Sequence, residues 1–450
     1  MNANLSYMMS RVSAVSTQTF KLTPQNSTSA SPGQQVRISL PSNTLLNLRS
    51  LKLMFAANTE ASSNEGSRLP AKIASLVDRV VLEAGGVTID GGSLNEYSTL
   101  LHAKHALEGD SCGPMSHPQI VRAKSYHSDA NAMAQGNPEQ YADNFDFVMP
   151  FDLGFLGSCE PSIIDTSLLP DLTVVIHLHS RDVISSSSNV ALDSFKTAAT
   201  SKNTNYNLSS IRLICECIGL GSGVYDQLVS RAISERGMVE LPFKQYTSTL
   251  DNHSGVTRFH VSTQSLDRIW AIFRPDTYND RGACVLVKGH KENGFAISGT
   301  DIGKPTYDLG GTYGLNNNSE KFIHKYHNFS GFSSRAGATL QFQLNGSLTP
   351  AFPGKPCEWL GMSMDSVEKN GYDIPVKTFD QYLNNYSVIC HRLCLPGSST
   401  REVAGLDSRG INLQCSLNST GLASDTNVVV FCECTSTLQI GPNKQFSVVQ

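Results

Sequence analysis

Residues 36–55 read VRISLPSNTLLNLRSLKLMF, and residues 257–273 repeat this order in the form TRFHVSTQSLDRIWAIF. Each stretch consists of an alternating segment, a polar break, a step of Leu followed by charged or polar residues, and a second alternating segment. Alternation of apolar and polar residues predicts β-strands with one buried face. Arg258 follows Arg37 by 221 residues. The pair therefore predicts that the chain contains two copies of one β unit.

Two further correspondences keep the same order along the chain. VVLEAGG at residues 80–86 matches TLQFQLNG at residues 339–346, and each leads into a short helix with an aromatic residue, Tyr97 or Trp359. We also pair LTVVIHLHS, from Leu172, with NVVVFCECTS, from Asn427. Conserved order with drifting spacing is expected of two copies of one fold with different loops. Such a duplication favours a building block over an enzyme.

The composition is that of a folded β protein. The chain has 450 residues, of which 40% are hydrophobic and 16% charged, and it is rich in Ser, Thr, Asn and Gly. This length allows two or three domains, and the composition is typical of strands joined by long polar loops. A net charge of −4 argues against a general nucleic-acid or membrane binder, which needs a basic excess.

The sequence also bears on compartment. It has no apolar run of about 18 residues, so we expect no transmembrane segment. The first residues lack the basic start and apolar core of a signal peptide. We therefore expect the eleven cysteines to be reduced thiols in a protein made inside a cell.

The pattern of strands and polar stretches divides the chain. We expect an N-terminal arm at residues 1–19, a first unit at 20–184, a linker at 185–207 and a second unit at 208–450. The second unit should open with a strand at residues 211–220, and the clearest helix of the first unit is residues 94–107. Residues 289–335 are rich in Gly, Asn and Tyr and predict a long exposed loop. Many short strands with few helices predict an all-β protein of two tandem jelly rolls or sandwiches.

One pair of residues could bind a metal. His177 and His179 lie two apart, so on a continuous strand they would share a face. A cupin-type metal site uses such a pair but needs further ligands, and Asp182 is offset by three from His179, which turns it to the opposite face. We interpret the two histidines as structural or interfacial, with metal binding as the alternative.

Two other motifs also have structural interpretations. Cys215/Cys217 and Cys432/Cys434 are each C-E-C, which in a strand places two small buried thiols on one face and the glutamate on the other. Zinc bound by both pairs is the alternative, although C-x-x-C is the commoner zinc spacing.

Glycines at 219, 221 and 223 suggest a phosphate-binding turn, but their spacing differs from G-x-G-x-x-G and no Lys follows. We interpret them as relieving a strand-to-helix turn, with Ser222 as the helix cap. The segment RIWAIFR, which alternates charged and aromatic residues, is interpreted as a half-buried strand rather than a surface that stacks on nucleic-acid bases.

Several stretches together resemble a known family, the double jelly-roll major capsid proteins of virophages, polinton-like viruses and larger DNA viruses. They are the opening segment from Thr19 to Phe55, FDFVMPFDLGFLGS from Phe145, VYDQLVSR from Val224, SLDRIWAIFR from Ser265 and NVVVFCECTSTLQIGPNKQFSVV from Asn427. These stretches span nearly the whole chain, and the duplication carries most of the resemblance.

The resemblance implies a structural protein of the virion that is assembled inside the host cell. In that family each chain places two eight-stranded jelly rolls side by side, and three chains form a trimer with a hexagonal outline. It implies a homotrimer that contacts neighbouring capsomers, penton proteins and minor capsid proteins. It implies no catalytic residues, no cofactor, no bound metal, no small-molecule substrate and no sequence-specific nucleic acid. Residues 289–335 would form an outward tower, and residues 1–19 would run beneath the capsomer.

Two other classes of function stay open at this stage. The first is a bicupin-like metalloenzyme that uses His177 and His179. The second is a tandem β-sandwich that binds glycans or a receptor through exposed aromatic residues such as Tyr307, Tyr313 and Tyr326. Bound metal in the purified protein would favour the first class, and glycan binding by the monomer would favour the second.

Overall fold

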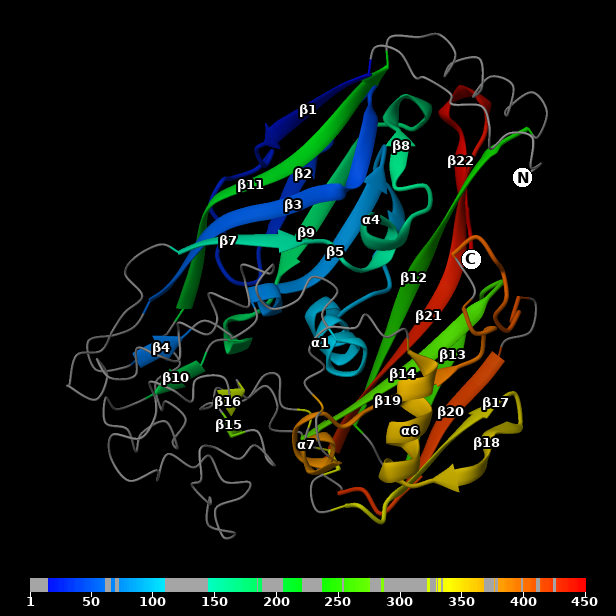
Figure 1. Cartoon of the computed structure of the whole chain (residues 1–450). Helices are drawn as coiled ribbons and strands as arrows, with labels where there is room; N and C mark the ends of the chain where they lie inside the picture. Colours follow the sequence, from blue (N-terminus) through cyan, green and yellow to red (C-terminus); the bar gives the residue numbers. More distant parts are fainter. Residues whose placement is uncertain are drawn as a thin grey trace.

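The computed structural model describes residues 15–60, 66–68, 73–109, 145–183, 185–187, 205–220, 237–252, 255–275, 285–286, 322–323, 329, 331–332, 335–367, 376, 379–397, 400–409, 413–423 and 426–450. Within these residues the chain forms two β-rolls, which Figure 1 shows side by side. Each roll is built from two antiparallel sheets. The prediction of an all-β protein with few short helices is confirmed.

The first roll contains sheets A and B. Sheet A has the order β1-β11-β3-β7, with β8 also paired to β3, and sheet B has the order β2-β9-β5-β6. The strands are β1 (Val15–Leu22), β2 (Gln35–Ser39), β3 (Leu45–Glu60), β5 (Val77–Ala84), β6 (Val87–Asp90), β7 (Phe145–Pro150), β8 (Ile163–Asp165), β9 (Leu172–Leu178) and β11 (Asn205–Leu220). Alternate residues face the core: in β2, Val36 and Ile38 are buried while their neighbours are not.

The second roll contains sheets C and D. Sheet C has the order β12-β21-β14-β19, with β22 also paired to β21, and sheet D has the order β13-β20-β17-β18. The strands are β12 (Val239–Asn252), β13 (Val256–Val261), β14 (Leu266–Pro275), β17 (Thr339–Leu344), β18 (Ser347–Gly354), β19 (Val388–Arg392), β20 (Leu413–Thr420), β21 (Thr426–Ile440) and β22 (Phe446–Val449).

The two rolls have the same strand order, which confirms the duplication. Taken in order across each sheet, β1, β11, β3 and β7 correspond to β12, β21, β14 and β19, and β2, β9, β5 and β6 correspond to β13, β20, β17 and β18. The hairpins at Gly85-Gly86 and Asn345-Gly346 also match, because both residues of each two-residue turn have positive φ. Such turns fit the twist of the flanking strands and favour Gly or Asn.

The third sequence correspondence is wrong. LTVVIHLHS forms β9, which lies in sheet B and corresponds to β20, whereas NVVVFCECTS lies in β21 of sheet C and corresponds to β11. β9 and β21 are both mainly apolar runs, and such a run does not reveal which sheet the strand joins. The true counterpart of β21 is IRLICECIGL in β11, which contains the other C-E-C motif.

Two predicted boundaries also need correction. The strand at residues 211–220 does not open the second roll, because β11 pairs with β1 and β3 of sheet A. We therefore propose that the first unit extends to Leu220. Residues 15–19 of the predicted arm belong to β1 and pair with β11 of the same chain, and residues 1–14 lie outside the described residues.

The linker and the long loop contain ordered pieces as well. β10 (Ser185–Ser187) of the predicted linker pairs with β4 (Gly66–Arg68). β15 (Val285–Leu286) pairs with β16 (Phe322–Ile323), which closes the base of the segment between them. Phe329 and Phe332, predicted to lie in an exposed loop, are buried, and Phe332 packs 4.8 Å from Phe273, measured between ring centroids. The predicted exposed loop therefore does not include Phe329 and Phe332.

The helices lie at the edges of the rolls. The predicted helix at residues 94–107 is confirmed as α1 (Tyr97–Glu108), which corresponds in position to α6 (Pro356–Ser366) of the second roll. α4 (Gly154–Ser158) follows β7, and α7 (Phe379–Asn385) precedes β19. No helix within the described ranges is long and apolar enough to cross a membrane.

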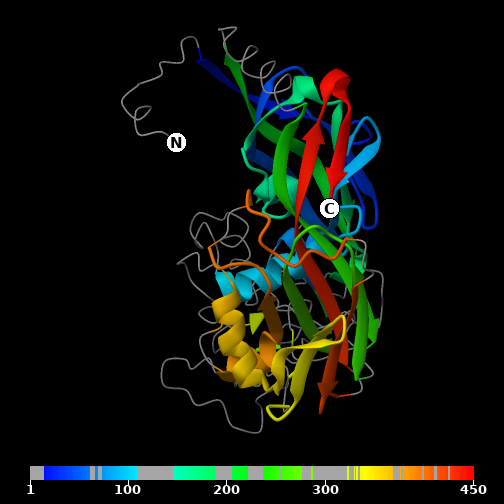
Figure 2. The same ribbon diagram turned by 90° about the vertical axis from the view of Figure 1, so that its right-hand side faces the viewer.

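β21 of sheet C is buried on both faces over most of its length, and this feature joins the two rolls. Along β21, Val428 and Val430 belong to the core of the second roll, while Val429 and Phe431 belong to a continuous apolar cluster with the first roll. Figures 1 and 2 show α1 between the body of the first roll and the strands of sheet C. The upper parts of β12 and β21 run on beside the first roll.

Candidate functional site at the contact between the rolls

The second C-E-C motif places a charged residue in the contact between the rolls. Cys432 and Cys434 belong to the core of the second roll, so strand alternation directs Glu433 to the opposite face of sheet C. That face carries Trp270 and Phe431 and meets α1 of the first roll. Glu433 is only 1% exposed. A buried carboxylate is costly unless cations and hydrogen-bond donors surround it.

Three donors surround Glu433. Arg268 Nη1 lies 2.7 Å from its Oε1, and Trp270 Nε1 donates to its Oε2 over 3.1 Å. Lys104 Nζ approaches Oε2 to 3.8 Å. Arg268 and Trp270 lie on β14 beside β21, whereas Lys104 comes from α1 of the first roll. The carboxylate therefore connects the two rolls electrostatically.

Lys104 is held by further groups from both rolls. Its Nζ lies 3.6 Å from Glu108 Oε1 within α1 and 3.2 Å from the Tyr246 hydroxyl of β12. It also lies 5.4 Å and 5.5 Å from the ring centroids of Tyr246 and Trp270. Those distances are within the range of cation–π attraction.

The protonation states follow from this arrangement. Burial alone would raise the pKa of Glu433, but Lys104, Arg268 and Lys244 lower it to about 2. Burial alone would lower the pKa of Lys104, but Glu108 and Glu433 hold it well above its usual value. Both groups are therefore charged at neutral pH, and the charges compensate each other inside the contact.

A second ion pair crosses the contact at the start of α1. Arg274 lies near the end of β14 and is 2% exposed. It donates from Nη2 to Glu96 Oε1 over 2.9 Å and from Nη1 to Glu96 Oε2 over 3.1 Å. Burial would raise the pKa of Glu96, but Arg274 lowers it below its usual value. Paired parallel bonds of this kind fix orientation as well as distance.

Where α4 meets β12, the contact between the rolls is apolar, and hydrogen bonds of the backbone lie at its edge. Phe155 of α4 packs edge-on against Phe243 of β12, with ring centroids 5.1 Å apart. Beside them, Lys244 N donates to Ser158 Oγ over 2.8 Å, and Glu160 N donates to Pro242 O over 3.0 Å. Aromatic packing and charge pairing together define one orientation of the second roll on the first.

The equivalent position in the first roll is different. Glu216 lies between Cys215 and Cys217 on β11 as Glu433 does on β21, and its Oε2 accepts a bond of 2.8 Å from Asn47 Nδ2 on β3. Glu216 and Asn47 are half-buried. The outer face of sheet A therefore has the same strand geometry, but no second roll covers it among the residues that the structure describes.

The predicted histidine pair does not form a ligand set. His177 is the last residue but one of β9. His179 lies beyond the end of β9, and its carbonyl oxygen accepts a hydrogen bond of 3.1 Å from Gly33 N. His177 Nε2 lies 3.5 Å from Arg79 Nη2. Burial and the Arg79 charge lower the pKa of His177, and the same guanidinium would repel a bound cation. Among the described residues, no three His, Cys, Asp or Glu side chains cluster as metal ligands do.

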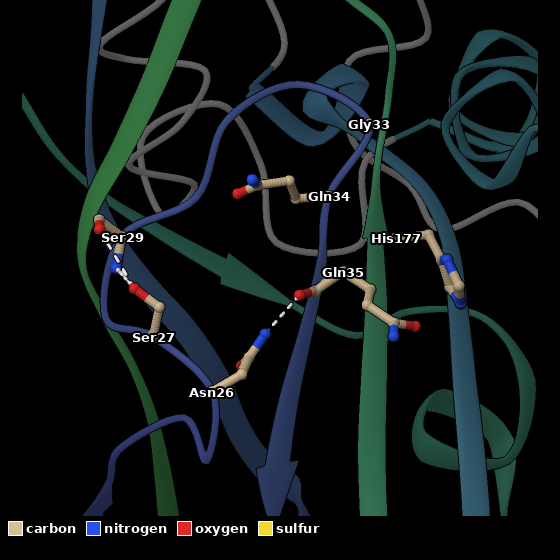
Figure 3. A pocket seen from close by; sticks show the side chains of 7 residues that line it. All are labelled: Asn26, Ser27, Ser29, Gly33, Gln34, Gln35 and His177. Carbon is tan, nitrogen blue, oxygen red and sulfur yellow. Dashed lines mark hydrogen bonds between the residues drawn. The ribbon is translucent and has the colours of Figure 1, made fainter.

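Figure 3 shows the polar hollow beside His177, which the turn before β2 forms with β9. Its polar groups bond largely to one another. Asn26 Nδ2 donates to Gln35 O over 2.7 Å, Ser29 N donates to Ser27 Oγ over 3.1 Å, and Ser31 N donates to Gln34 Oε1 over 2.9 Å. These bonds hold the turn at Gly33, which has φ of 76°. The polar side chains that line the hollow therefore serve to hold the turn before β2.

The other predicted motifs have structural positions. The two cysteine pairs lie in different cores, one in sheet A and one in sheet C, so they cannot share a zinc ion. The nine described cysteines are free thiols. Gly219 lies within β11 opposite Ser16. Gly221, Gly223, Ser222, Tyr307, Tyr313 and Tyr326 lie outside the described residues.

The residues that join the rolls were not identified from the sequence. Glu433, Arg268 and Lys104 each lie in a segment that was recognised as a strand or a helix. The only signal in the sequence was Glu433 itself, a charged residue within an apolar strand. Such a residue, when buried, requires a partner of opposite charge. Pairing it with Lys104 requires the packing of α1 on sheet C, which no local pattern encodes.

The topology and the packing define the class. Two four-stranded antiparallel sheets per roll, repeated in the same order and packed side by side, constitute a double jelly-roll protein. Neither protein-family models nor curated proteins give a match to the sequence.

Three solved structures that come from viruses are similar to the chain. The chain is similar to a chain of the PBCV-1 virus capsid, with a TM-score of 0.59, 12% identity and 98% of each chain covered. It is also similar to the Faustovirus major capsid protein, with a TM-score of 0.52, 9% identity and coverage of 97% of this chain and 92% of that one. A chain of the Sputnik virophage gives a TM-score of 0.51 and 11% identity, covering 100% and 92%. The double jelly-roll fold is thereby confirmed over nearly the full length.

Proposed function

We propose that this chain is the major capsid protein of an icosahedral DNA virus and a structural protein without catalysis. The observation that carries the proposal is the pair of matched rolls, whose fold matches capsid structures from end to end. Three copies would form a capsomer in which six rolls give a hexagonal outline. A pseudo-six-fold block of this kind tiles a closed lattice with similar contacts on all sides.

The contact between the rolls suits this role. A capsomer keeps its outline only if the two rolls of each chain hold a fixed angle. Inter-domain contacts within a chain allow relative motion unless they are large and apolar. Here the contact combines an apolar cluster with the paired charges of Glu433, Lys104, Glu96 and Arg274. It therefore supports a rigid unit.

Two segments are proposed to reach beyond the rolls. The segment between β15 and β16 is proposed as the tower on the outer surface of the virion, since its ends are tied together at the base. Deleting residues 316–319 should leave the trimer intact, and loss of the trimer would contradict the assignment. Residues 1–14, which precede β1, are proposed to contact neighbouring capsomers or minor proteins. Their removal should then reduce particle stability without affecting the trimer.

The partners follow from the same proposal. Neighbouring capsomers, penton proteins and minor capsid proteins would contact the sides and base of the trimer. The protein would be synthesised and assembled in the host cell and then be part of the virion. No substrate or cofactor is assigned to it.

The mass of the purified full-length protein in solution tests the proposal. Light scattering behind a sizing column should give a species near three times 48.7 kDa. Negative-stain images of that species should have hexagonal outlines. A stable monomer that does not form particles when it is expressed with the other virion proteins would contradict the proposal.

A further inference from the structure

The outer face of sheet D carries a polar trough. Phe259, Phe342 and Leu417 of this sheet belong to the core of the second roll, so the residues that alternate with them lie on the opposite, outer face. β20 runs between β13 and β17 in this sheet (Figure 1). A hollow of about 640 Å³ lies on the outer face of these three strands. This volume is within the range of sites that bind small ligands.

Differences in side-chain length give the trough its shape. Arg258 of β13, Ser416 of β20 and Gln343 of β17 are neighbours in register across the outer face, and all three line the hollow. The short side chain of Ser416 forms the floor between the two longer ones. His260 and Gln414 form the next pair in register and line the hollow as well. The trough therefore follows β20, with β13 and β17 as its walls.

The polar side chains that line this trough are not used by the fold. Arg258, His260 and Gln414 are exposed, and Gln343 is half-buried. None of these four side chains has a hydrogen-bond or ion-pair partner within the described part of the chain. The hollow beside His177 differs, because its polar groups bond to one another and hold a turn. The trough on sheet D therefore presents donors and acceptors that are available to a ligand.

The equivalent face of the first roll is filled and neutralised. Arg37 of β2 lies in register with Val175 of β9 and Val81 of β5, which are 2% and 6% exposed. Arg37 Nη2 lies 2.5 Å from Glu83 Oε2, so an ion pair compensates its charge. Glu83 precedes its hairpin turn by two residues, as Gln343 does in the second roll. The second roll thus has serine where the first has a valine floor, and an amide where the first has a carboxylate.

The lining of the trough defines the chemistry of its ligand. A guanidinium has five N–H donors and no acceptor, so Arg258 suits a carboxylate or a sulfate group. An amide side chain both donates and accepts, so Gln343 and Gln414 suit hydroxyl groups, which do the same. Among the described residues that line the hollow, none is acidic, so its charge complements an anion. An anionic group among hydroxyl groups is the pattern of an acidic saccharide.

A nucleic acid fits this lining less well. Nucleic acids are held by several Lys and Arg side chains and, when single-stranded, by aromatic rings that stack on the bases. The described residues of the trough include one arginine and no aromatic ring. Along β20 the trough extends over residues 414–418, which is about 13 Å at the usual rise of a strand. This length suits a short oligosaccharide.

We propose that the trough along β20 is a binding site for an acidic saccharide. Arg258 holds the anionic group, Gln343 and Gln414 bond to hydroxyl groups, and a sugar ring lies over Ser416. Val256, which is 44% exposed, lines the trough and packs on the apolar face of a ring. The site is separate from the contact between the rolls. The inference goes beyond the capsid role and does not rest on it.

Titration calorimetry of the purified full-length protein tests the proposal at physiological ionic strength. The probes are a sulfated oligosaccharide prepared from heparin, an oligogalacturonate that carries carboxylates, and an uncharged maltooligosaccharide of matched length. At least one acidic probe should bind, and the uncharged probe should bind about ten-fold more weakly or less, because it lacks the charged hydrogen bond. The tighter of the two acidic probes identifies the anionic group. Binding of neither acidic probe, or equal binding of the uncharged one, would overturn the inference and leave the capsid role standing.

Matched variants locate the site. Arg258→Gln should weaken binding of the acidic probe about ten-fold or more, whereas Arg37→Gln, the same change on the equivalent strand of the first roll, should not. Gln343→Glu should abolish binding, because it places a carboxylate beside Arg258 as Glu83 is placed beside Arg37. These changes lie on outer faces, so the melting temperatures should stay close to that of wild type. Equal losses in Arg258→Gln and Arg37→Gln would show unspecific attraction of anions and overturn the inference.

Discussion

The two rolls share a strand order but differ at their matched glutamates. Glu216 and Glu433 lie at the same place in β11 and β21, each between two cysteines that face a core. Glu216 is half-buried and bonds to Asn47, whereas Glu433 is buried and bonds to Arg268 and Trp270. Strand geometry therefore decides where each glutamate points, and the neighbouring roll decides what it contacts. The difference teaches that duplication preserved the interior while the outer faces diverged.

The largest difference is expected when each glutamate is removed. Glu433→Ala removes the buried carboxylate that Arg268 and Lys104 both contact, and breaking a buried ion pair typically costs about 3–5 kcal/mol of unfolding free energy. Glu216→Ala removes a half-exposed hydrogen bond and should cost about 1 kcal/mol. Chemical denaturation of both variants measures the two costs. Equal costs would show that the contact between the rolls does not depend on Glu433.

A pH effect is expected where α4 joins the contact. Asp90 accepts from Phe155 N over 2.7 Å, and burial raises its pKa from 3.8 to about 6, partly offset by bonds from the Phe155 and Gly91 amides. A raised carboxyl pKa in the folded state means that stability is lost as the pH rises through about 6. The loss for a shift of this size is about 3 kcal/mol.

Asp90→Asn tests this effect because the amide keeps an acceptor and cannot ionise. The variant should be more stable than wild type at pH 8 and similar at pH 4, as measured by denaturation at each pH. If the unfolding free energies of wild type and variant differ by the same amount from pH 4 to pH 8, the ionisation of Asp90 does not affect stability. Asp165→Asn is the control. Asp165 caps a short 3-10 turn by accepting a hydrogen bond from Ser167 N, and the asparagine side-chain oxygen can accept the same bond.

Substitutions at the matched core cysteines of the two rolls should lower the unfolding free energy by similar amounts. Cys215 and Cys432 occupy matched buried positions in the two cores, at 0% and 3% exposure. Replacing either by Ser buries a hydroxyl among apolar side chains, which costs about 1–3 kcal/mol. We expect the two costs to agree within about 1 kcal/mol. A large difference between them would weaken the equivalence of β11 and β21.

The smallest effect is expected at the exposed rim of the contact. Arg401 Nε lies 3.7 Å from Glu160 Oε2 across the two rolls, and their side chains are 65% and 36% exposed. Exposed pairs contribute about 0–1 kcal/mol. Arg401→Ala should therefore leave the unfolding free energy almost unchanged, and least changed at high salt, where the exposed pair is screened. A cost comparable to that of Glu433→Ala would contradict the ranking of the two sites.

The strand pairs and turns could be predicted from the sequence where local signals are strong. Alternation identified β2, β3, β13 and β14, and the Gly85-Gly86 and Asn345-Gly346 turns identified their matched hairpins. The assignment failed for β9, β11 and β21, whose apolar runs do not specify which sheet they join. β11 was placed in the wrong roll because it is distant in sequence from β3, its partner.

The contact between the rolls could not be predicted for a related reason. Lys104 lies in a helix that was recognised, and Glu433 in a strand that was recognised, but their proximity depends on tertiary packing across 329 residues of sequence. The histidine pair was visible in the sequence because its spacing is local, yet its second member lies beyond the strand. Local spacing therefore located candidate residues better than it predicted their environment.

The central claim is the proposed capsid role, in which three copies of this chain form one ring of six rolls. Single-particle cryo-EM of the purified wild-type oligomer tests this claim most directly. The account predicts a three-fold ring of six rolls. A monomer or a two-fold dimer would contradict it.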